Sequence, residues 1–525
     1  MRMLKLHAQT LLKRHDTFLI AGKRGREVVQ VVRHLSNVSA DVLVEESAKP
    51  FTAIPGPPRL PVLGTLLPYK VGLKKLSEYH HEVCRLHQQY GPVVREVFGS
   101  QTLVHVFDPA DIKTVYDNDG KMPHVPPLQE TSQFYRKKKS ISPGLGNING
   151  EEWYRLRHAV QQMMLRPRET SYYYPIQDEV ACRAVDKLEA ELDDQGFVRN
   201  LDFLIPKWIM ESAGMCCFEK SIGCLNGGAG EDWSQRLVET NLKIFQLSAE
   251  MKFSLRLYRF FKSPKYRSLL SLEDYFYGST FKFINDVVEE LKALVAQNKL
   301  QEGQYNFLTY LLSRKELSHK DVLAITFSLF TDGLSTTAPT FLGNLHCLAL
   351  NQDVQETLYQ EINKTHIDPD APITLGVINK MRYLKAVVKE VFRFYPVGEA
   401  VQRFSQRDMV LGGYHIPAWT YLELNPYVWL QSKEHFVEPE KFMPERWLRD
   451  TAGTSTINPY VLNPFSMGIR MCAGRRFAEQ DIYIGLCRLL LKFRVEATSN
   501  DPPEQEWAVL LKPKTPLPVK FVKRE

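Results

Sequence analysis

The sequence lacks any run of about eighteen consecutive apolar residues, the length that a membrane-spanning helix requires. Its longest uncharged stretch, residues 333–352, is too polar for that role and contains Pro339. Cysteine is also scarce, because eight thiols are spread irregularly over 525 residues, which argues against a disulfide framework and fits a reducing compartment. Internal repeats, low-complexity blocks and nicotinamide- or flavin-binding fingerprints are absent as well. These absences favour a globular protein that is soluble or bound peripherally to a membrane.

Positive charge is concentrated at the start of the chain. The formal net charge is +7, and residues 1–40 contain eight Lys or Arg against two acidic residues, so the rest of the chain is close to neutral. A near-neutral body gives little support to nucleic-acid binding. Basic residues interspersed with short apolar clusters and few acids are typical of a mitochondrial transit peptide. We therefore expect residues 1–45 to be a targeting leader; the alternative is a solvated N-terminus without a targeting role.

The body, residues 46–525, is expected to be mainly α-helical with small β-sheets, an α+β fold. It opens with the Pro- and Gly-rich segment 54–64, which can be neither a helix nor a central strand. Further along, apolar residues recur at helical spacing, and β-branched or aromatic runs beside Gly-containing turns predict strands. The expected helices are 153–165, 178–192, 284–297, 320–350, 354–364, 383–394 and 473–493. The expected strands are 93–97 and 102–107, and a second region of short strands covers 409–417, with Gly412-Gly413 within it, and 421–424.

One cysteine has surroundings that suggest chemistry. Cys472 lies in the run Phe-Ser-Met-Gly-Ile-Arg-Met-Cys-Ala-Gly, residues 465–474, directly before the last long helical pattern. Unpaired N–H groups and the positive dipole end at a helix N-terminus favour a thiolate there, and Arg470 is expected to add a cation. Gly468 and Gly474 permit the tight backbone path and let amides approach the sulfur. A thiolate held in this way is suited to be the axial ligand of a haem iron.

The spacing F-x-x-G-x-R-x-C-x-G, from Phe465 to Gly474, resembles the haem-binding signature of the cytochrome P-450 monooxygenases at every fixed position. A cysteine at a helix start is on its own more often structural, so the assignment depends on this spacing. The resemblance covers residues 50–525. It implies the cytochrome P-450 fold, with haem b between a long oxygen-binding helix and the helix after the cysteine loop. It also implies that Cys472 is the axial iron ligand.

Shorter motifs, in the order that the family requires, agree with this resemblance. Trp153 and Arg157 match the W-x-x-x-R motif, in which both residues bind a haem propionate. Arg403 stands where the family has a further propionate-binding arginine.

The resemblance also implies a structural triad beneath the haem. Glu390 and Arg393 match the family's E-x-x-R motif, and Arg446 would be the third member. A Glu–Arg pair at i, i+3 is, without the family, more often an exposed ion pair of little energetic value.

The expected oxygen-binding helix departs from the family pattern in segment 331–339. That pattern is a small residue or Gly, then Gly, any residue, an acid, and Thr; the Gly opens a bulge over the iron, and the acid–Thr pair relays protons to bound dioxygen. Gly333 and Thr336 match the pattern. Ser335 stands where the acid is expected, and Asp332 replaces the small residue.

Asp332 is a candidate substitute for the missing acid. In a helix Asp332 lies one turn before Ser335 and Thr336, so the three side chains share a face. Pro339 cannot donate to the carbonyl of Ser335, which loosens the helix beside Thr336. We hypothesise that Asp332, through Ser335 or a water at the loosened turn, delivers protons to Thr336. The alternative is that Asp332 only forms a hydrogen bond within the bulge, while water alone supplies protons.

Electrons must come from a separate protein. Lys385 and Lys389, at i and i+4, match lysines of mitochondrial P-450s that dock an acidic [2Fe–2S] ferredoxin, which an NADPH–ferredoxin reductase reduces. Arg475 and Arg476, after the cysteine, also resemble the mitochondrial class. Paired lysines are by themselves more often a solvated surface, but the basic leader agrees with ferredoxin docking. Such docking is steered by charge and weakens with salt.

The substrate chamber is expected to include segments 122–134 and 245–277, Phe327 and Thr331 of the oxygen-binding helix, and Val397. These residues are largely apolar and suit a lipophilic, steroid-like molecule. Segment 245–277 is alternatively ordinary core or a loop that dips into a membrane.

The sequence thus predicts a mitochondrial haem-thiolate monooxygenase in peripheral contact with the matrix side of the inner membrane. Residues 255–277 and 510–517 are most similar to arthropod ecdysone 20-monooxygenases, which implies conversion of ecdysone to 20-hydroxyecdysone. One alternative is a mitochondrial hydroxylase of another sterol, a vitamin D-like compound or a xenobiotic. Because Ser335 replaces the acid, a haem-thiolate lipid-binding or sensor protein without turnover is the alternative from another class.

Overall fold

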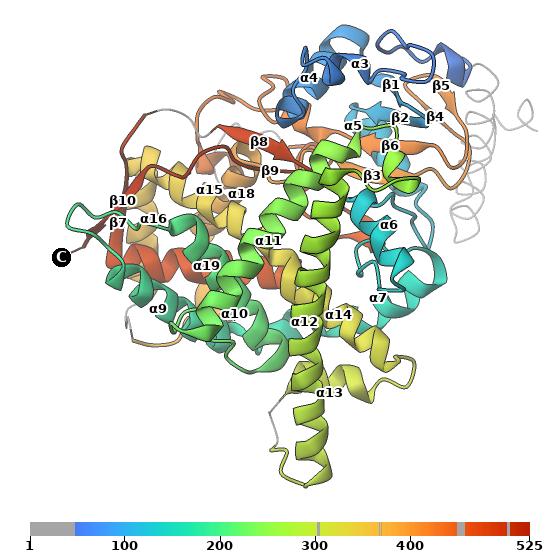
Figure 1. Ribbon diagram of the computed structural model, residues 1–525. Coiled ribbons are helices and arrows are strands. Elements are labelled where there is room, and N and C mark those ends of the chain that lie inside the picture. Colours follow the sequence, from blue (N-terminus) through green and yellow to red (C-terminus); the bar gives the residue numbers. More distant parts are fainter. Residues whose placement is uncertain are drawn as a thin grey trace, which may run out of the picture.

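The computed structural model describes residues 48–301, 305–366, 368, 370–448, 457–500 and 504–524. The expected leader, residues 1–45, lies outside the described residues. Helices make up most of the molecule, and the largest sheet lies at one side of it (Figure 1). The expectation of a mainly α-helical fold with small sheets is therefore confirmed. Among the described residues, no helix is both long enough and apolar enough to span a bilayer.

Strands from two distant parts of the chain form the largest sheet, in the order β1-β2-β6-β3. The hairpin β1 (Val93–Phe98) and β2 (Gln101–Val106) is antiparallel, β2 pairs in parallel with β6 (Tyr421–Leu424), and β6 pairs antiparallel with β3 (Val401–Phe404). The sequence predicts the hairpin and β6 but not their union in one sheet. The two-stranded sheets are β4 (Met409–Leu411) with β5 (Tyr414–Ile416), β7 (Phe493–Ala497) with β10 (Val519–Lys523), and β8 (Gln505–Ala508) with β9 (Leu510–Pro513).

Most of the expected helices are present, with ends that differ by a few residues. The helices before the long central pair are α3 (Leu67–Lys70), α4 (Tyr79–Tyr90), α5 (Pro109–Asp117), α6 (Glu130–Lys138), α7 (Gly150–Leu165), α8 (Pro167–Ser171), α9 (Tyr174–Ala190) and α10 (Leu201–Phe218). The later helices are α13 (Asn306–Ser313), α14 (His319–Thr331), α15 (Thr337–Leu350), α16 (Gln352–Thr365), α17 (Leu375–Lys380), α18 (Arg382–Phe394) and α19 (Arg475–Lys492).

The long central pair is α11 (Ala229–Lys252) and α12 (Pro264–Ala296), which lie side by side (Figure 1). The sequence predicts only the last part of α12, residues 284–297. The helix in fact begins twenty residues earlier, at Pro264. The Ser263 side chain caps it by accepting a hydrogen bond from the amide of Tyr266 at 3.2 Å, and proline is favourable at the first helical position.

The prediction of one continuous helix over residues 320–350 is wrong, because the structure has two helices in this segment. After α14 a short 3-10 segment, η4 (Asp332–Ser335), precedes α15. Thr336 lies between them with φ −128° and ψ −62°, outside the helical region. Pro339 lies in the first turn of α15, where backbone N–H groups have no partner within the helix. The sequence argument that Pro339 loosens the helix beside Thr336 therefore points to the correct place.

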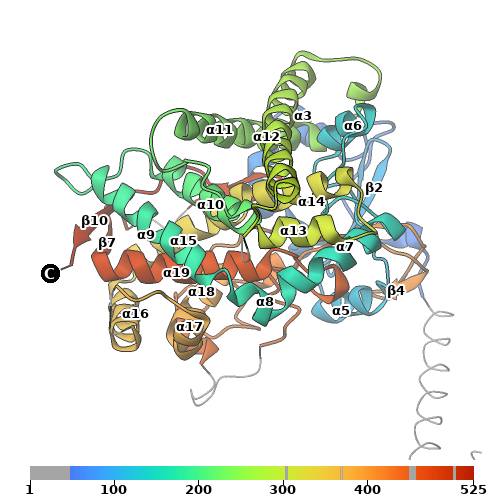
Figure 2. The ribbon, with the colours of Figure 1, turned by 90° about the horizontal axis from the view of Figure 1, so that it is seen from below.

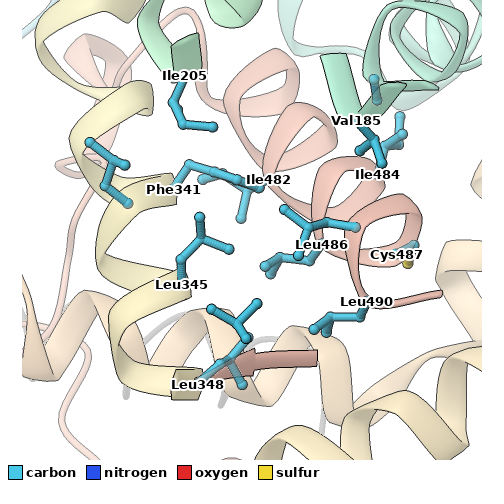
Figure 3. Close-up of a cluster of buried hydrophobic side chains, with 14 of the residues drawn as sticks. Val185, Ile205, Phe341, Leu345, Leu348, Ile482, Ile484, Leu486, Cys487 and Leu490 are labelled. Atoms are coloured by element: carbon cyan, nitrogen blue, oxygen red, sulfur yellow. The ribbon is translucent and has the colours of Figure 1, made fainter. Parts of the chain in front are cut away.

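The packing of α19 against α15 fixes the cysteine loop relative to this helix break. Figure 3 shows apolar side chains of the two helices facing one another, and all of those named here are buried: Phe341, Leu345 and Leu348 of α15 and Ile482, Leu486 and Leu490 of α19. Burying such side chains contributes about 1.5–3 kcal/mol each. A Cβ at Gly485 would lie 2.0 Å from the Trp208 ring, so α10 also approaches α19 closely. Figure 2 shows α19 crossing the molecule beside α9.

Candidate functional site

The cysteine loop leads directly into α19. The amide of Cys472 donates a 2.8 Å hydrogen bond to the carbonyl of Phe465, which closes the loop. Gly468 has φ +74°, a left-handed conformation that glycine adopts without a steric cost. The Phe465 ring packs edge-on against Phe392 of α18, with centroids 5.2 Å apart. The Cys472 side chain is accessible, although burial in protein raises its pKa, so the sulfur borders an internal space.

Burial raises the pKa of the Cys472 thiol above its ordinary value, and the negative charge of Asp332 adds to this increase. The backbone N–H groups of Gly474 and Arg475 lower this pKa, as the position at a helix start predicts, but burial has the larger effect. The cation that lowers it is Arg157 of α7, not Arg470 as the sequence suggested. The loop alone therefore does not hold a thiolate, and deprotonation would come with metal coordination.

Arginines from three elements converge beside the cysteine loop. Arg470 has a pKa lowered to about 9, because it is buried and lies near the cations Arg403 of β3 and Arg157. Asp119 is the carboxylate that acts on this group, and Arg403 Nε donates to it at 2.9 Å. Three guanidinium groups beside one carboxylate leave a surplus of positive charge.

The remaining arginine contacts hold the loop in place. Arg470 donates to the carbonyls of Pro123 at 2.8 Å and Ile148 at 2.6 Å, and its guanidinium stacks 4.5 Å from the centre of the Trp153 ring. Arg157 Nη2 donates to the carbonyl of Met471 at 2.8 Å. The buried Nε of Arg157 has no partner within the described residues.

These residues fit haem b. Its two propionate groups match the surplus positive charge of the arginines in sign and number, and the orphaned Arg157 Nε offers a donor to one of them. The accessible thiol of Cys472 offers the axial ligand. The structure thus brings Trp153, Arg157, Arg403 and Arg470 together with the cysteine loop, as the resemblance implies. Within the described ranges, no three His, Cys, Asp or Glu side chains gather as ligands for a metal ion.

The expected triad is assembled at the end of α18. Glu390 accepts hydrogen bonds from Arg393 Nη2 at 2.6 Å and from Arg446 Nε at 3.1 Å, and both Glu390 and Arg393 are fully buried. Arg393 also donates to the carbonyls of Leu430 and Pro439. Trp447, a member that sequence reasoning missed, donates its Nε1–H to Glu390 at 2.8 Å.

The hydrogen bonds at the break between α14 and α15 differ from those that the hypothesis of proton delivery from Asp332 through Ser335 requires. Thr336 Oγ1 donates to the backbone carbonyl of Asp332 at 2.9 Å, and Ser335 Oγ accepts a 2.7 Å hydrogen bond from Asn241 of α11. In the part of the chain that the structure describes, the Asp332 carboxyl makes no direct hydrogen bond to Ser335 or Thr336. Burial raises the pKa of Asp332 to about 7, and Arg136 acts to lower it.

The basic residues expected to dock a partner lie on α18 and at the start of α19. Lys389 is exposed, with Nζ 4.1 Å from the centre of the Trp447 ring. Partial desolvation and the neighbouring Arg475 lower its pKa. Arg475 donates to Glu479 at 3.0 Å. Lys385 is half-buried and donates to Asn379 at 3.2 Å. Arg476 is half-buried in the first turn of α19.

The residues expected to line the substrate chamber differ in burial and in their contacts. Phe327 is buried in an aromatic cluster, with its ring stacked 4.3 Å from that of Tyr277. Thr331 is buried and donates to the carbonyl of Phe327 at 2.9 Å. Val397 is half-buried, and its carbonyl accepts from the amide of Leu511 at 2.8 Å.

A separate cavity of about 490 Å³ lies between the α6–α7 connection and the first turn of α14. Polar and charged residues contribute to its lining, among them Gln133, Lys137, Asn147, Glu152 and Lys320. Cys472 does not line it, so this cavity is not the expected haem site, although Pro127 and Gln133 of the expected chamber segment 122–134 line it.

Comparison with known proteins agrees with the geometry. A family model described as "Cytochrome P450" matches residues 54–521. A "Probable cytochrome P450 CYP44" from Caenorhabditis elegans is 38% identical over 90% of this chain and 94% of its own length. The mitochondrial 1,25-dihydroxyvitamin D(3) 24-hydroxylase of Mus musculus is 28% identical over 92% of this chain and 91% of its own. A "Probable cytochrome P450 12a5, mitochondrial" from Drosophila melanogaster is 29% identical over 90% and 91%.

Proposed function

The chain belongs to the cytochrome P450 family, and from this premise we propose that it is a mitochondrial monooxygenase that hydroxylates a lipophilic, steroid-like substrate. As a member of the family it is an oxidoreductase that incorporates one oxygen atom from O2 and carries haem b with an axial cysteine thiolate. The observation that carries the proposal is the accessible Cys472 thiol beside three arginines that carry surplus positive charge. Bound haem supplies the cleavage of dioxygen, which a thiolate ligand favours.

Cys472 is the proposed iron ligand, and the residues around it are proposed to hold the porphyrin. Arg157, Arg403 and Arg470 would bind the propionates, and Trp153 would keep the Arg470 guanidinium in place by stacking. In the loop, Phe465, Gly468 and Gly474 shape the backbone that presents the sulfur. The buried Glu390 network holds the adjoining segment, because its carboxylate joins α18 to the chain around Arg446.

Proton delivery is proposed to depend on Asp332 and Thr336. A carboxyl with a pKa of about 7 exchanges protons readily near neutral pH. The hydroxyl of Thr336 is oriented by its hydrogen bond to the carbonyl of Asp332, so a water between the Asp332 carboxyl and Thr336 would complete a relay. Ser335 is a supporting group in this relay, because Asn241 already donates to its oxygen and its own proton must point elsewhere.

The mitochondrial part of the proposal rests on the basic leader and on relatives whose names place them in mitochondria. An acidic [2Fe–2S] ferredoxin, reduced by an NADPH–ferredoxin reductase, would supply electrons to the face that Lys385, Lys389, Arg475 and Arg476 form. The proximity of Lys389 and Arg475, whose charge lowers the lysine pKa, supports a concentrated positive patch there. A matrix location fits this partner.

The steroid-like substrate is supported by the apolar and aromatic character of α12 and α14. Phe327 and Tyr277 belong to one buried cluster there, and one relative is named as a vitamin D hydroxylase. Ecdysone is the specific substrate that the sequence similarity suggests, and a vitamin D-like compound or another sterol is the alternative. A lipid sensor without turnover is a second candidate only because Ser335 replaces the usual acid.

Reconstitution tests the proposal. Purified full-length protein loaded with haem is incubated with ferredoxin, its reductase, NADPH and a panel containing ecdysone, vitamin D compounds and other sterols. We expect a product one oxygen atom heavier than its substrate, formed only when ferredoxin is present. Cys472→Ala is the control that should lose both turnover and the thiolate-type carbon monoxide spectrum. Substrate binding without NADPH consumption would instead support the sensor.

Charge reversal tests the partner face in the same assay. Lys389→Glu should raise the ferredoxin concentration for half-maximal rate about tenfold at low salt, and the difference should shrink as salt is added. Lys282→Glu reverses an exposed lysine of α12, outside the proposed face, and should leave that concentration unchanged. Equal effects of the two variants, or no effect of Lys389→Glu on a fully haem-loaded sample, would contradict ferredoxin docking at this face.

A further inference from the structure

A hollow of about 520 Å³ lies between α6 and the connection that joins α11 to α12. Figure 1 shows α6 beside the upper part of α12. Five residues of α6 and one of the connection line this hollow: Glu130, Gln133, Phe134, Lys137, Lys138 and Arg259. Three of these side chains are cations and one is an acid, so we call it the basic hollow.

The acid of the basic hollow is already paired. Glu130 accepts a hydrogen bond from Arg259 and forms a 2.8 Å ion pair with Arg256 of the same connection. Within the described residues, neither Lys137 nor Lys138 forms an ion pair. Both lysines are exposed, and Lys137 also lines the neighbouring cavity of about 490 Å³. The hollow therefore keeps two positive charges that no acid in the described part of the chain neutralises in an ion pair.

The Phe134 ring holds two of the cations close together. Lys138 Nζ lies 4.5 Å from the ring centre, and the guanidinium carbon of Arg259 lies 6.0 Å from it. Because both contact the same ring, they are no more than about 10.5 Å apart. Tyr258 packs edge-on against Phe134, with centroids 5.7 Å apart, which supports the ring from the side of the connection. A group with two phosphates can bridge this span.

The connection that carries Arg259 also exposes apolar side chains. Leu257, Phe260 and Phe261 are exposed in the same turn of the chain. A soluble anion has no use for these side chains, whereas a phospholipid in a bilayer presents its phosphate directly above apolar acyl chains. Cations beside exposed aromatic and aliphatic side chains are typical of segments that lie in the interface of an anionic membrane. The surroundings of the hollow therefore favour a lipid headgroup as its occupant.

We propose that the basic hollow binds the headgroup of a phospholipid with two phosphate groups, in a bilayer that the exposed connection touches. Lys138 and Arg259 donate to phosphate oxygens, and Lys137 compensates the second negative charge at the edge of the hollow. Both segments that the sequence places at the substrate chamber, 122–134 and 245–277, contribute lining residues. A bound headgroup would therefore hold these two segments together. The inference goes beyond the proposed function, because it concerns a lipid rather than the substrate.

Diffuse attraction between a basic surface and an anionic membrane is the competing account. Lys139 separates the two accounts, because it is the next residue of the chain, is exposed and does not line the hollow. Its Nζ lies 3.4 Å from the Asp274 carboxylate. Lys139→Gln therefore removes the same charge as Lys138→Gln from the same stretch of surface, but outside the hollow.

The test is co-flotation of the haem-loaded full chain with vesicles at about 0.15 M salt, where charges more than about 8 Å apart are largely screened. The vesicles contain phosphatidylcholine, either alone or with phosphatidylglycerol or cardiolipin mixed to the same surface charge. We expect the strongest binding to cardiolipin, which has two phosphate groups. Lys138→Gln should lower that partition coefficient at least about fivefold, and Lys137→Gln with Lys138→Gln about thirtyfold. Lys139→Gln should change it less than about twofold, and all variants should keep the wild-type carbon monoxide spectrum.

All of these proteins retain the basic residues of segment 1–40, so a difference between them reports on the hollow. Equal losses in Lys138→Gln and Lys139→Gln, or equal binding of the wild type to the two anionic lipids, would overturn the site. Release of the protein by inorganic phosphate at the concentration of the lipid phosphate would show that a soluble anion is the occupant and would overturn a lipid. Flotation uses neither substrate nor ferredoxin, so lipid binding without turnover would overturn the proposed function alone.

Discussion

At the scale of single residues, the segment between α14 and α15 lacks the acid that the family has before its threonine. Ser335 occupies that position, and the nearby carboxyl group is that of Asp332. Ser335, where the family has an acid, is tied to Asn241 of α11. Asp332, where the family has a small residue, has an accessible side chain, but desolvation by the surrounding protein raises its pKa to about 7. An ordinary aspartate would be ionised throughout the neutral range. The unusual carboxyl is therefore the group at this site whose protonation changes near physiological pH.

Asp332→Asn should lower the coupling of NADPH consumption to product. With a pKa of about 7, roughly nine-tenths of the wild-type carboxyl is protonated at about pH 6 and roughly one-tenth at about pH 8. Product formed per NADPH should therefore fall in the wild type as the pH rises across this range. The asparagine variant should form less product and more peroxide at all of these pH values, without the same pH dependence.

The control for the Asp332→Asn experiment is the wild-type protein, measured in the same coupling assay. Both proteins use the same ferredoxin and reductase, so any pH effect of those partners appears equally in wild type and variant. An unchanged product yield per NADPH in Asp332→Asn, without extra peroxide, would show that water alone supplies the protons.

At the scale of elements, sequence patterns foresaw local structure better than long-range contacts. The hairpin, β6 and the ends of α18 follow from alternating or helical patterns that lie within the segments themselves. The division between α14 and α15 was signalled by Pro339 but drawn as one helix, because the apolar pattern continues across it. The Asp119–Arg403 pair and the Asn241–Ser335 contact join residues far apart in sequence, and no spacing encodes such contacts.

The Glu390 network is the contact set in which motif and structure agree most closely. Its arginines were found because the family motif fixes their spacing, whereas Trp447 was missed because its indole N–H reaches Glu390 only through the fold. The network is nonetheless a buried arrangement of one carboxylate with two guanidinium groups. Removal of the carboxylate would leave both cations without their charge partner.

Glu390→Ala should destabilise the protein by about 3–5 kcal/mol, because it leaves buried charges unpaired. We expect little or no haem-loaded protein, measured by the carbon monoxide spectrum and by the thermal midpoint. Trp447→Phe removes a single hydrogen bond to the same carboxylate and should lower the free energy of unfolding by about 1–3 kcal/mol. This variant should therefore still fold. Glu438→Gln breaks the exposed pair with Lys441 and should change stability by less than about 1 kcal/mol. Similar losses in all three variants would contradict a special role for Glu390.

At the scale of the whole molecule, one surface combines exposed apolar side chains with lysines and arginines. The α3 region and the connection between α11 and α12 form it together. Tyr69 of α3 lies 6.4 Å from Phe253, measured between ring centroids. Partial desolvation and the nearby charge of Lys265 lower the pKa of Lys70. The exposed apolar side chains here include Val62, Leu67, Val71, Leu73, Leu257, Phe260 and Phe261. We call this surface the α3–α12 face.

A large patch of exposed apolar side chains on a protein surface usually marks an interaction site. Phe260 is 85% exposed, and Leu73 is 81% exposed. Lys262, Lys265 and Lys70 are exposed beside them, which suits the anionic headgroups of a lipid bilayer. We therefore propose that the α3–α12 face makes the peripheral membrane contact. A lipophilic substrate would then enter from the bilayer that this face touches.

The full chain should float with phospholipid vesicles, and more strongly when the vesicles contain an anionic lipid. Burying a phenylalanine side chain contributes about 1.5–3 kcal/mol, so Phe260→Ser with Phe261→Ser should reduce the vesicle partition coefficient at least about tenfold. All variants keep the same N-terminal leader, so a difference between them reports on the α3–α12 face alone. Val437→Ser alters a side chain that is 72% exposed near Arg446, away from this face, and should bind like the wild type. If the two phenylalanines can be removed without loss of binding, the contact lies elsewhere on the molecule.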